Sequence, residues 1–186
     1  DRRRGRGKQL VPSAVKARAR ELGCPVFTPE RIRKDIQVQQ DLSQLNADVS
    51  VVVAFGQILP KSMLQQPPLG CWNGHGSLLP RWRGAGPIQW SLLEGDSETG
   101  VGIMAMEEGL DTGPVLIEQH LPIALHDNAE QLALKLSQLT GELMVTAMTR
   151  IAAAGPGTES ERLRRLGVTK QDETNGAATY ARMLKT

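Results

Sequence analysis

The sequence predicts an α/β fold in which a mostly parallel sheet carries helices on both faces. Segments of strand character alternate with segments of helical periodicity along the 186 residues. One strand candidate, residues 49–55, is apolar and β-branched without polar alternation, as expected of a strand buried on both faces of a parallel sheet. Apolar residues make up 40% of the chain and aromatic residues 3%, so a largely aliphatic core can form.

The N-terminal half contains helix and strand candidates in alternation. A Gly- and Arg-rich stretch over residues 1–10 lacks periodicity and is expected to form a loop. A helix candidate covers residues 13–22, with Ser13 at its start and Gly23 just after its end. The further candidates are strands over residues 25–28, 49–55 and 69–73, a polar helix over 36–45 and a short helix opened by Pro60.

The C-terminal half is dominated by one long helix, which Asp127 opens and Gly155 ends, with Glu130 at capping-box spacing from Asp127. A helix over residues 85–94 and strands over 100–106 and 115–120 precede it. From Pro156 onward the chain is polar, and we expect an irregular linker. The long helix has an apolar face formed by Leu132, Leu136, Leu139, Leu143, Ala147 and Ile151.

Composition disfavours several classes of protein. No apolar run reaches 18 residues and none follows the opening Arg residues, so we expect neither a membrane span nor a secretory signal. Cys24 and Cys71 cannot build a disulfide framework, which favours a reduced, cytoplasmic setting. Residues 1–34 hold 11 of the 22 Lys and Arg but 3 of the 20 Asp and Glu, a local balance of +8. This basic segment predicts either a polyanionic partner or a solvated tail.

Polar groups of catalytic type gather where strands are expected to end. Asn73 and His75 follow one strand candidate, and in an extended chain residues i and i+2 share a face. Asp111 lies on a Gly-flanked turn, residues 109–113, between two other strands. Each group also has a simpler interpretation. Asn73-Gly74 is a strong signal for a type I′ turn, a lone His75 is commonly structural, and Asp111 is a good turn former.

Other site chemistries find little support in the sequence. Cys71 and His75 are the one close pair of metal-ligand types, which is too few for a metal site. No Gly-rich dinucleotide motif or phosphate loop is present, and Ser77 does not lie in a nucleophile-elbow pattern. The residues alone therefore predict an α/β enzyme with an Asn/His/Asp cluster beyond the carboxyl ends of its strands.

Two strings of residues carry a family resemblance. Residues 73–89, Asn-Gly-His-Gly-Ser-Leu-Leu-Pro-Arg-Trp-Arg-Gly-Ala-Gly-Pro-Ile-Gln, followed by Gly-Leu-Asp-Thr-Gly at 109–113, closely resemble the folate-dependent formyltransferases. The Gly-Arg-Gly-Lys segment at 5–8, ahead of Pro-Ser at 12–13, points to the branch that acts on tRNA. The similarity covers nearly the whole chain and implies the Rossmann-like formyltransferase fold.

The resemblance implies an activity and three catalytic residues. Members of the family move a formyl group from 10-formyltetrahydrofolate to a primary amine, which in the tRNA branch belongs to methionine esterified to initiator tRNA. Asn73 would donate to the formyl oxygen, and His75 would bond the same oxygen or protonate the leaving nitrogen. Asp111 would position His75 and help to take the proton of the amine. No metal is implied, and we expect a monomer without membrane contact.

Two binding surfaces are also implied by the resemblance. The folate cofactor would lie between two loops whose main chain holds its pterin ring, with a third stretch lining the same cleft. These segments comprise Gly56, Gln57, Ile58, Leu59, Ser77, Leu78, Leu79, Pro80, Met106, Glu107, Glu108, Gly109 and Leu110. A basic loop would reach the acceptor stem of the initiator tRNA through Arg2, Arg3, Arg4, Arg6 and Lys8.

The sequence departs from the family pattern in a few places. Gly74 stands where an apolar residue usually separates the catalytic Asn and His, and we expect it to loosen the backbone there. Trp72 and Trp90 stand where smaller or more polar residues are usual. The family has a strand-helix-strand segment before the basic loop and a small β-barrel domain after the catalytic one. We therefore expect residues 1–155 to form an N-terminally truncated catalytic domain and residues 156–186 to form a linker.

Three alternatives remain open. The chain could be a formyltransferase for an aminosugar nucleotide, a glycinamide ribonucleotide formyltransferase, or an inactive remnant that binds folate or tRNA. The Gly-Arg-Gly-Lys segment argues against the first alternative and the Arg-Trp-Arg-Gly-Ala string against the second. The intact set of Asn73, His75 and Asp111 argues against the third.

Overall fold

The computed structural model describes residues 2–4, 9–171 and 176–184, and its centre is a four-stranded sheet in the order β3-β4-β6-β7. β3 and β4 are parallel, whereas β4 and β6, and β6 and β7, are antiparallel. The sheet is therefore mixed rather than mostly parallel, because the 106–114 loop joins β6 to β7 without the crossover helix that parallel neighbours need. The four strands are Ser50–Val53 (β3), Cys71–His75 (β4), Glu98–Ala105 (β6) and Val115–Pro122 (β7).

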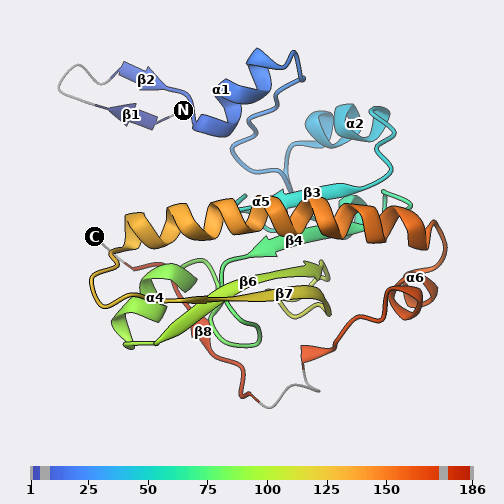
Figure 1. Ribbon diagram of the computed structural model, residues 1–186. Helices are drawn as coiled ribbons and strands as arrows, with labels where there is room; N and C mark the ends of the chain where they lie inside the picture. Colours follow the sequence, from blue (N-terminus) through green and yellow to red (C-terminus); the bar gives the residue numbers. More distant parts are fainter. Residues whose placement is uncertain (1, 5–8, 172–175, 185–186) are drawn as a thin grey trace.

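Helices lie on both faces of this sheet, as predicted. The longest, α5 (Ala129–Ala154), runs across one face (Figure 1) and packs on β6 and β7. On the other face, the last carbonyls of α3 (Lys61–Leu64) accept from the Cys71 thiol of β4 at 3.5 Å. α4 (Pro87–Leu93) and α6 (Glu159–Leu166) contact α5. None of the helices that the structure describes combines the length and apolar character that crossing a bilayer requires.

The core lies between α5 and the sheet. All six residues of the predicted apolar face are buried there, against Trp72, Val101 and Ile103 among others, which confirms the helical periodicity. The start of α5 differs by one residue from the prediction. Asn128, not Asp127, is the N-cap, and it forms a reciprocal capping box with Gln131. Asp127 is instead bound to Lys135 at 2.7 Å.

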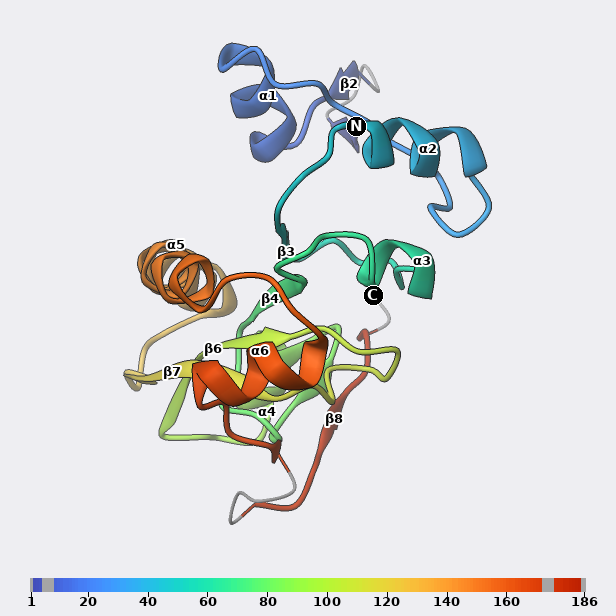
Figure 2. The same cartoon turned by 90° about the vertical axis from the view of Figure 1, so that its right-hand side faces the viewer.

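β3 is less buried than its apolar sequence predicts. Exposure alternates along it, and Val51 and Val53 are 46% and 51% exposed. The reason is that β3 pairs with β4 alone among the strands that the structure describes, so its other edge and part of its surface stay uncovered. Both views place the preceding helices, α1 (Ala14–Glu21) and α2 (Ile36–Gln44), on the side of β3 away from β4 (Figures 1 and 2).

Two predictions for the N-terminal segment are wrong. The expected loop contains two short antiparallel strands, β1 (Arg2–Arg4) and β2 (Gln9–Val11), although residues 5–8 lie outside the described part of the chain. Residues 25–28 form no strand and pair with no strand in the described ranges. Pro25 begins this segment and Pro29 follows it, and proline has no N–H to donate to a neighbouring strand. α1 and α2 confirm both predicted helices, and Pro60 precedes α3 as predicted.

The segment after Pro156 is regular rather than irregular. Thr158 and Glu161 form a capping box at the start of α6, and Gly167 ends that helix in the left-handed conformation with φ 61°. Farther on, β8 (Tyr180–Ala181) pairs in parallel with β5 (Arg83–Gly84), a short strand that follows β4. The C-terminal segment thus returns to the stretch that follows β4, along the lower side of the molecule in Figure 1.

Candidate active site

The carboxyl end of β4 presents Asn73 and His75 on one face of the sheet. Trp72 belongs to the core beneath α5, and Gly74 faces Thr140 of that helix. Because side chains alternate along a strand, Asn73 and His75 point to the opposite face. The type I′ turn is excluded, since Gly74 continues β4 and pairs with a residue of β3 on one side and of β6 on the other.

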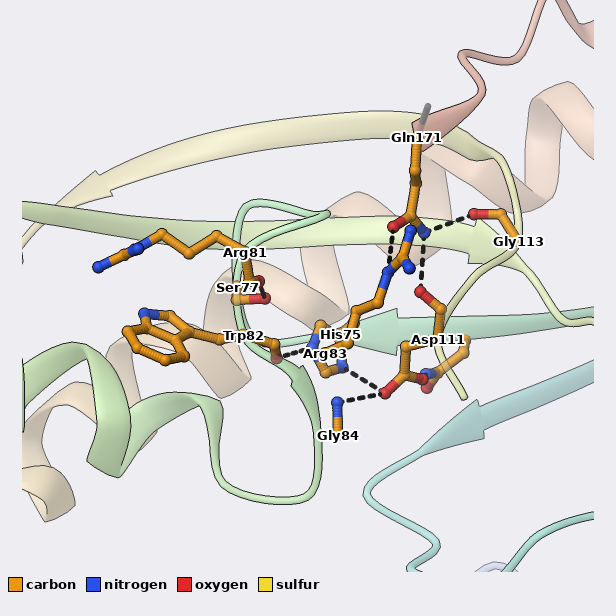
Figure 3. Close-up of polar contacts among 10 residues, drawn as sticks. His75, Ser77, Arg81, Trp82, Arg83, Gly84, Asp111, Gly113 and Gln171 are labelled. Atoms are coloured by element: carbon orange, nitrogen blue, oxygen red, sulfur yellow. Dashed lines mark hydrogen bonds and ion pairs between the residues drawn. The ribbon is translucent and has the colours of Figure 1, made fainter. Parts of the chain in front are cut away.

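Asp111 reaches this pair from the 106–114 loop (Figure 3). Its backbone is left-handed, with φ 50°, and its carboxylate turns toward the end of β4. Asn73 Nδ2 lies 3.4 Å from Asp111 Oδ1, and His75 Nδ1 lies 3.7 Å from Asp111 Oδ2. The main-chain N–H of Gly84 donates to Asp111 Oδ2 at 2.8 Å. The structure therefore brings the three predicted catalytic residues together, whereas their individual roles stay predictions.

His75 is buried, and the partner of its second ring nitrogen fixes its tautomer. Nε2 lies 2.9 Å from the carbonyl oxygen of Trp82. A carbonyl can only accept, so the hydrogen is assigned to Nε2. Nδ1 is then the nitrogen that faces Asp111.

Arg81 and Trp82, which follow Pro80, form a set of polar and aromatic contacts around the residue whose carbonyl binds His75. Arg81 donates two hydrogen bonds to Asp96, at 3.0 and 2.6 Å, and its guanidinium lies 4.3 Å from the centroid of the Trp82 ring. Trp82 also donates to Asp96 at 2.7 Å and stacks on Trp90 at 5.7 Å. Burial by itself would raise the pKa of Asp96, but the hydrogen bonds from Arg81 and Trp82 outweigh it and hold that pKa below its usual value. The tryptophan at position 90, which departs from the family pattern, is therefore explained by its packing against Trp82.

Gly74 does not loosen the backbone as predicted. A Cβ at this position would lie 2.6 Å from Thr140 Cγ2, so the glycine lets α5 approach the sheet closely. Trp72 fills the same face beside it and donates from its indole nitrogen to the Leu69 carbonyl at 3.0 Å. Both departures from the family pattern therefore belong to the contact between β4 and α5.

A cavity of about 1200 Å³ is lined by residues of α3, β4, α6 and the 106–114 loop, Thr112 and Gln171 among them, but not by Asn73, His75 or Asp111 themselves. An ion pair of 2.8 Å between Lys61 of α3 and Glu108 of the 106–114 loop lies at its wall, and this partner raises the pKa of Lys61. Burial raises the pKa of the Cys71 thiol, which also lines the cavity. Of the predicted cofactor residues, Met106, Glu107 and Glu108 line this cavity.

The other predicted cofactor residues do not line this cavity. The Gln57 side chain accepts from the Ile32 N–H at 2.7 Å and donates to the Pro29 carbonyl at 3.1 Å, so it anchors the preceding loop. Leu79 is buried with Met104 and Val115. Ser77 and Pro80 are buried as well, Leu78 and Leu59 are half-buried, and Gly56, Ile58, Gly109 and Leu110 are exposed. The part of these residues in cofactor binding stays a prediction.

The predicted tRNA contacts are described only in part. Arg2, Arg3 and Arg4 form β1, whereas Arg6 and Lys8 lie outside the described residues. No group of three or more His, Cys, Asp or Glu in the described part of the chain could hold a metal ion.

One residue of the site has no role in the sequence prediction. Gln171, 3% exposed, donates to the main-chain oxygens of Asp111 at 2.9 Å and Gly113 at 2.7 Å. Its side-chain oxygen accepts from Arg83 Nε at 2.9 Å. A glutamine in a polar segment carries no sequence signal of burial, so only the tertiary structure reveals this contact.

The protein has relatives of known family. A model of the formyl transferase family matches residues 1–148. The chain is 74% identical over 184 residues to a methionyl-tRNA formyltransferase of Synechococcus sp. strain WH7803 and 65% identical over 184 residues to one of Prochlorococcus marinus strain MIT 9313. Both alignments cover 99% of this chain but 53% and 54% of the relatives, so the chain spans about half the length of these curated proteins.

Solved structures of formyltransferases share the fold. A phosphoribosylglycinamide formyltransferase from Anaplasma phagocytophilum aligns with a TM-score of 0.66 at 25% identity, covering 73% of this chain and 67% of that one. One from Bacillus halodurans aligns with a TM-score of 0.63 at 27% identity, covering 72% of each chain. These likenesses confirm the predicted Rossmann-like α/β fold. With its family model matched over most of its length and its Asn/His/Asp cluster assembled, the chain belongs to the formyl transferase family.

Proposed function

We propose that this protein transfers a formyl group from 10-formyltetrahydrofolate to the amino group of methionyl initiator tRNA. The observation that carries the proposal is the convergence of Asn73, His75 and Asp111 at the end of β4. The identity of 74% to a methionyl-tRNA formyltransferase supports the choice of acceptor.

The cluster supplies the groups that acyl transfer to an amine requires. In such a reaction the amine nitrogen bonds to the formyl carbon, negative charge develops on the formyl oxygen, and the bond from that carbon to N10 of the folate breaks. The amine releases a proton, and the leaving N10 takes one up. Asn73 offers amide N–H donors for the formyl oxygen. Nδ1 of His75 can take up a proton and give it to the leaving nitrogen. The Asp111 carboxylate lies within 3.4 Å of the Asn73 amide and 3.7 Å of the His75 ring, close enough to accept the amine proton directly or through one water.

The cavity suits a flat, hydrogen-bonding heterocycle such as the pterin of folate. Residues 106–108 line the cavity together with Leu64 and Cys71, so polar and apolar groups both border it. Folate in its 10-formyl form would supply the formyl group.

The N-terminal segment suits a tRNA acceptor by its charge. Residues 1–34 carry a balance of +8, while the rest of the chain is net acidic. Lys and Arg in this density attract phosphate groups, and the attraction weakens as salt is added. We therefore assign tRNA contact to this segment.

An acceptor panel tests the proposal. The protein is incubated with 10-formyltetrahydrofolate and either methionyl initiator tRNA, an aminosugar nucleotide or glycinamide ribonucleotide, and N-formyl product is measured by mass spectrometry. We expect product with methionyl-tRNA, with a rate that falls as salt rises, and none when folate is omitted. Formylation of the sugar nucleotide or of glycinamide ribonucleotide, but not of the tRNA, would reject the proposed acceptor.

A further inference from the structure

Gln171 lies above Asp111 in the view of Figure 3 and is hydrogen-bonded to its main chain. One side-chain nitrogen donates to two carbonyl oxygens, of Asp111 at 2.9 Å and of Gly113 at 2.7 Å. Both bonds are made in the interior, because Gln171 is 3% exposed. Buried hydrogen bonds of this kind are costly to lose, since water does not replace them.

Arg83 fixes which end of the Gln171 amide faces the loop. Its Nε donates to Gln171 Oε1 at 2.9 Å, and an arginine can only donate. The amide nitrogen must then point toward the two carbonyls, which can only accept. The arrangement therefore admits one amide orientation, in which all three hydrogen bonds are satisfied together.

The residue after Arg83 holds the same aspartate from the other side. The Gly84 N–H donates to Asp111 Oδ2 at 2.8 Å. Gly84 therefore binds the carboxylate of Asp111 directly, while Arg83 is linked to the main chain of Asp111 through Gln171. Asp111 has a left-handed backbone with φ 50°, a conformation that an aspartate adopts at some cost and that needs support from its surroundings.

We propose that Gln171 is a positioning residue for Asp111: its amide, oriented by Arg83, holds the Asp111 main chain so that the carboxylate stays beside Asn73 and His75. This inference rests on the proposed function for its kinetic consequences, whereas the positioning itself is a property of the fold. Gln171 and Arg83 also line the cavity, but the amide of Gln171 is bound to the Asp111 and Gly113 carbonyls and to Arg83. A positioning role therefore predicts a change in kcat, whereas direct contact with the cofactor would change its KM.

The sharpest variant is Gln171→Glu, which keeps the shape and the acceptor for Arg83 but removes both donors. At neutral pH its carboxylate would face two carbonyl oxygens, and Asp111 would shift. We expect kcat for formyl transfer to fall on the order of 10²-fold, with little change in the KM values, because misplacement of a reacting group costs rate rather than binding. A protonated Glu regains one donor, so the deficit should shrink as the pH is lowered toward 5.5.

Two further measurements keep the test decisive. Amide hydrogen exchange at Gly84, followed by NMR, reports the Gly84–Asp111 bond without any substrate, and we expect loss of protection in Gln171→Glu. Arg83→Met, which frees the amide orientation and keeps Gln171, should show a smaller change of the same kind, and it serves if Gln171→Glu does not fold. Arg83→Lys keeps a donor and should restore most of the protection.

The outcomes separate the two proposals. If the native protein formylates none of the acceptors, the proposed function fails, and Gly84 exchange still decides the positioning role. If Gln171→Glu keeps both native kcat and native Gly84 protection, the positioning role is wrong. A fall in kcat that is equal at every pH, with Gly84 protection unchanged, would likewise overturn it.

Discussion

Gly74 faces Thr140 across the interface between β4 and α5, where there is space for a hydrogen but not for a methyl group. A Cβ on Gly74 would lie 2.6 Å from Thr140 Cγ2, and the Thr140 hydroxyl is already bound to the Leu136 carbonyl at 2.7 Å. Since Gly74 lies between Asn73 and His75, the seating of α5 on the sheet and the placement of both site residues depend on one contact.

Gly74→Ala should destabilise the protein by about 1–3 kcal/mol, because the added methyl overpacks a buried contact. Thr140→Ser removes Cγ2 and keeps the hydroxyl bond to Leu136. The double variant should therefore recover much of the loss, which urea denaturation of both single variants and the double variant measures as a coupling energy. Strict additivity of the two changes would contradict the contact.

The two cysteines should differ in reactivity toward alkylating reagents. Burial raises the pKa of the Cys71 thiol, so its thiolate fraction at neutral pH is small, whereas Cys24 is exposed. With iodoacetamide at pH 7, mass spectrometry should find Cys24 modified and Cys71 largely unmodified. Labelling of Cys71 should accelerate as the pH rises. Equal rates for the two residues at pH 7 would show that Cys71 is not shielded.

Asp96 should contribute stability that is lost in acid. The hydrogen bonds from Arg81 and Trp82 hold its pKa below its ordinary value of 3.8, despite the opposing effect of burial. A lowered pKa in the folded state stabilises the fold above the pKa of the unfolded chain, and this contribution disappears as the pH falls through the folded value. Thermal unfolding of the native protein and of Asp96→Asn should therefore differ most at neutral pH.

The control for this prediction is the same comparison of Tm values at acidic pH. The gap in Tm between the native protein and Asp96→Asn should narrow steadily below pH 4, where the native carboxylate takes up a proton. Asparagine has one side-chain oxygen, which can accept from the Trp82 indole, but it cannot also accept the bond that Arg81 Nη2 makes to Asp96 Oδ1. The comparison therefore measures the loss of the charge together with that bond. A gap that is constant from pH 7 to pH 3 would mean that the Arg81–Asp96 pair does not stabilise the fold.

Local patterns in the sequence predict much of the fold, and contacts between distant segments account for what they miss. The apolar face of α5 and the convergence of Asn73 and His75 follow from the periods of helix and strand, and both appear in the structure. Asn128 is the N-cap, whereas Asp127 accepts from Lys135 and from the Ala124 N–H. Such competition between neighbouring caps cannot be read from spacing alone.

The exposure of β3 and the place of Gln171 could not be predicted for a related reason. An apolar β-branched run looks the same in a central strand and in one that pairs on a single side. Gln171 meets Asp111 across 60 positions of sequence, and its burial depends on the path of the chain after α6. The capping box at Thr158 and Glu161 was visible in the sequence and would have predicted α6.

The most direct test of the account is the single-turnover rate of formyl transfer to methionyl initiator tRNA in the native protein, Asp111→Asn, Asn73→Ala and the double variant. Asp111→Asn keeps the shape of the side chain and removes its charge. We predict a loss of about 10²–10⁴-fold for Asp111→Asn and 10²–10³-fold for Asn73→Ala. The double variant should lose less than the product of the two, because both residues act on one group. A native rate in Asp111→Asn, with the variant folded, would contradict the assignment of this cluster as the catalytic site.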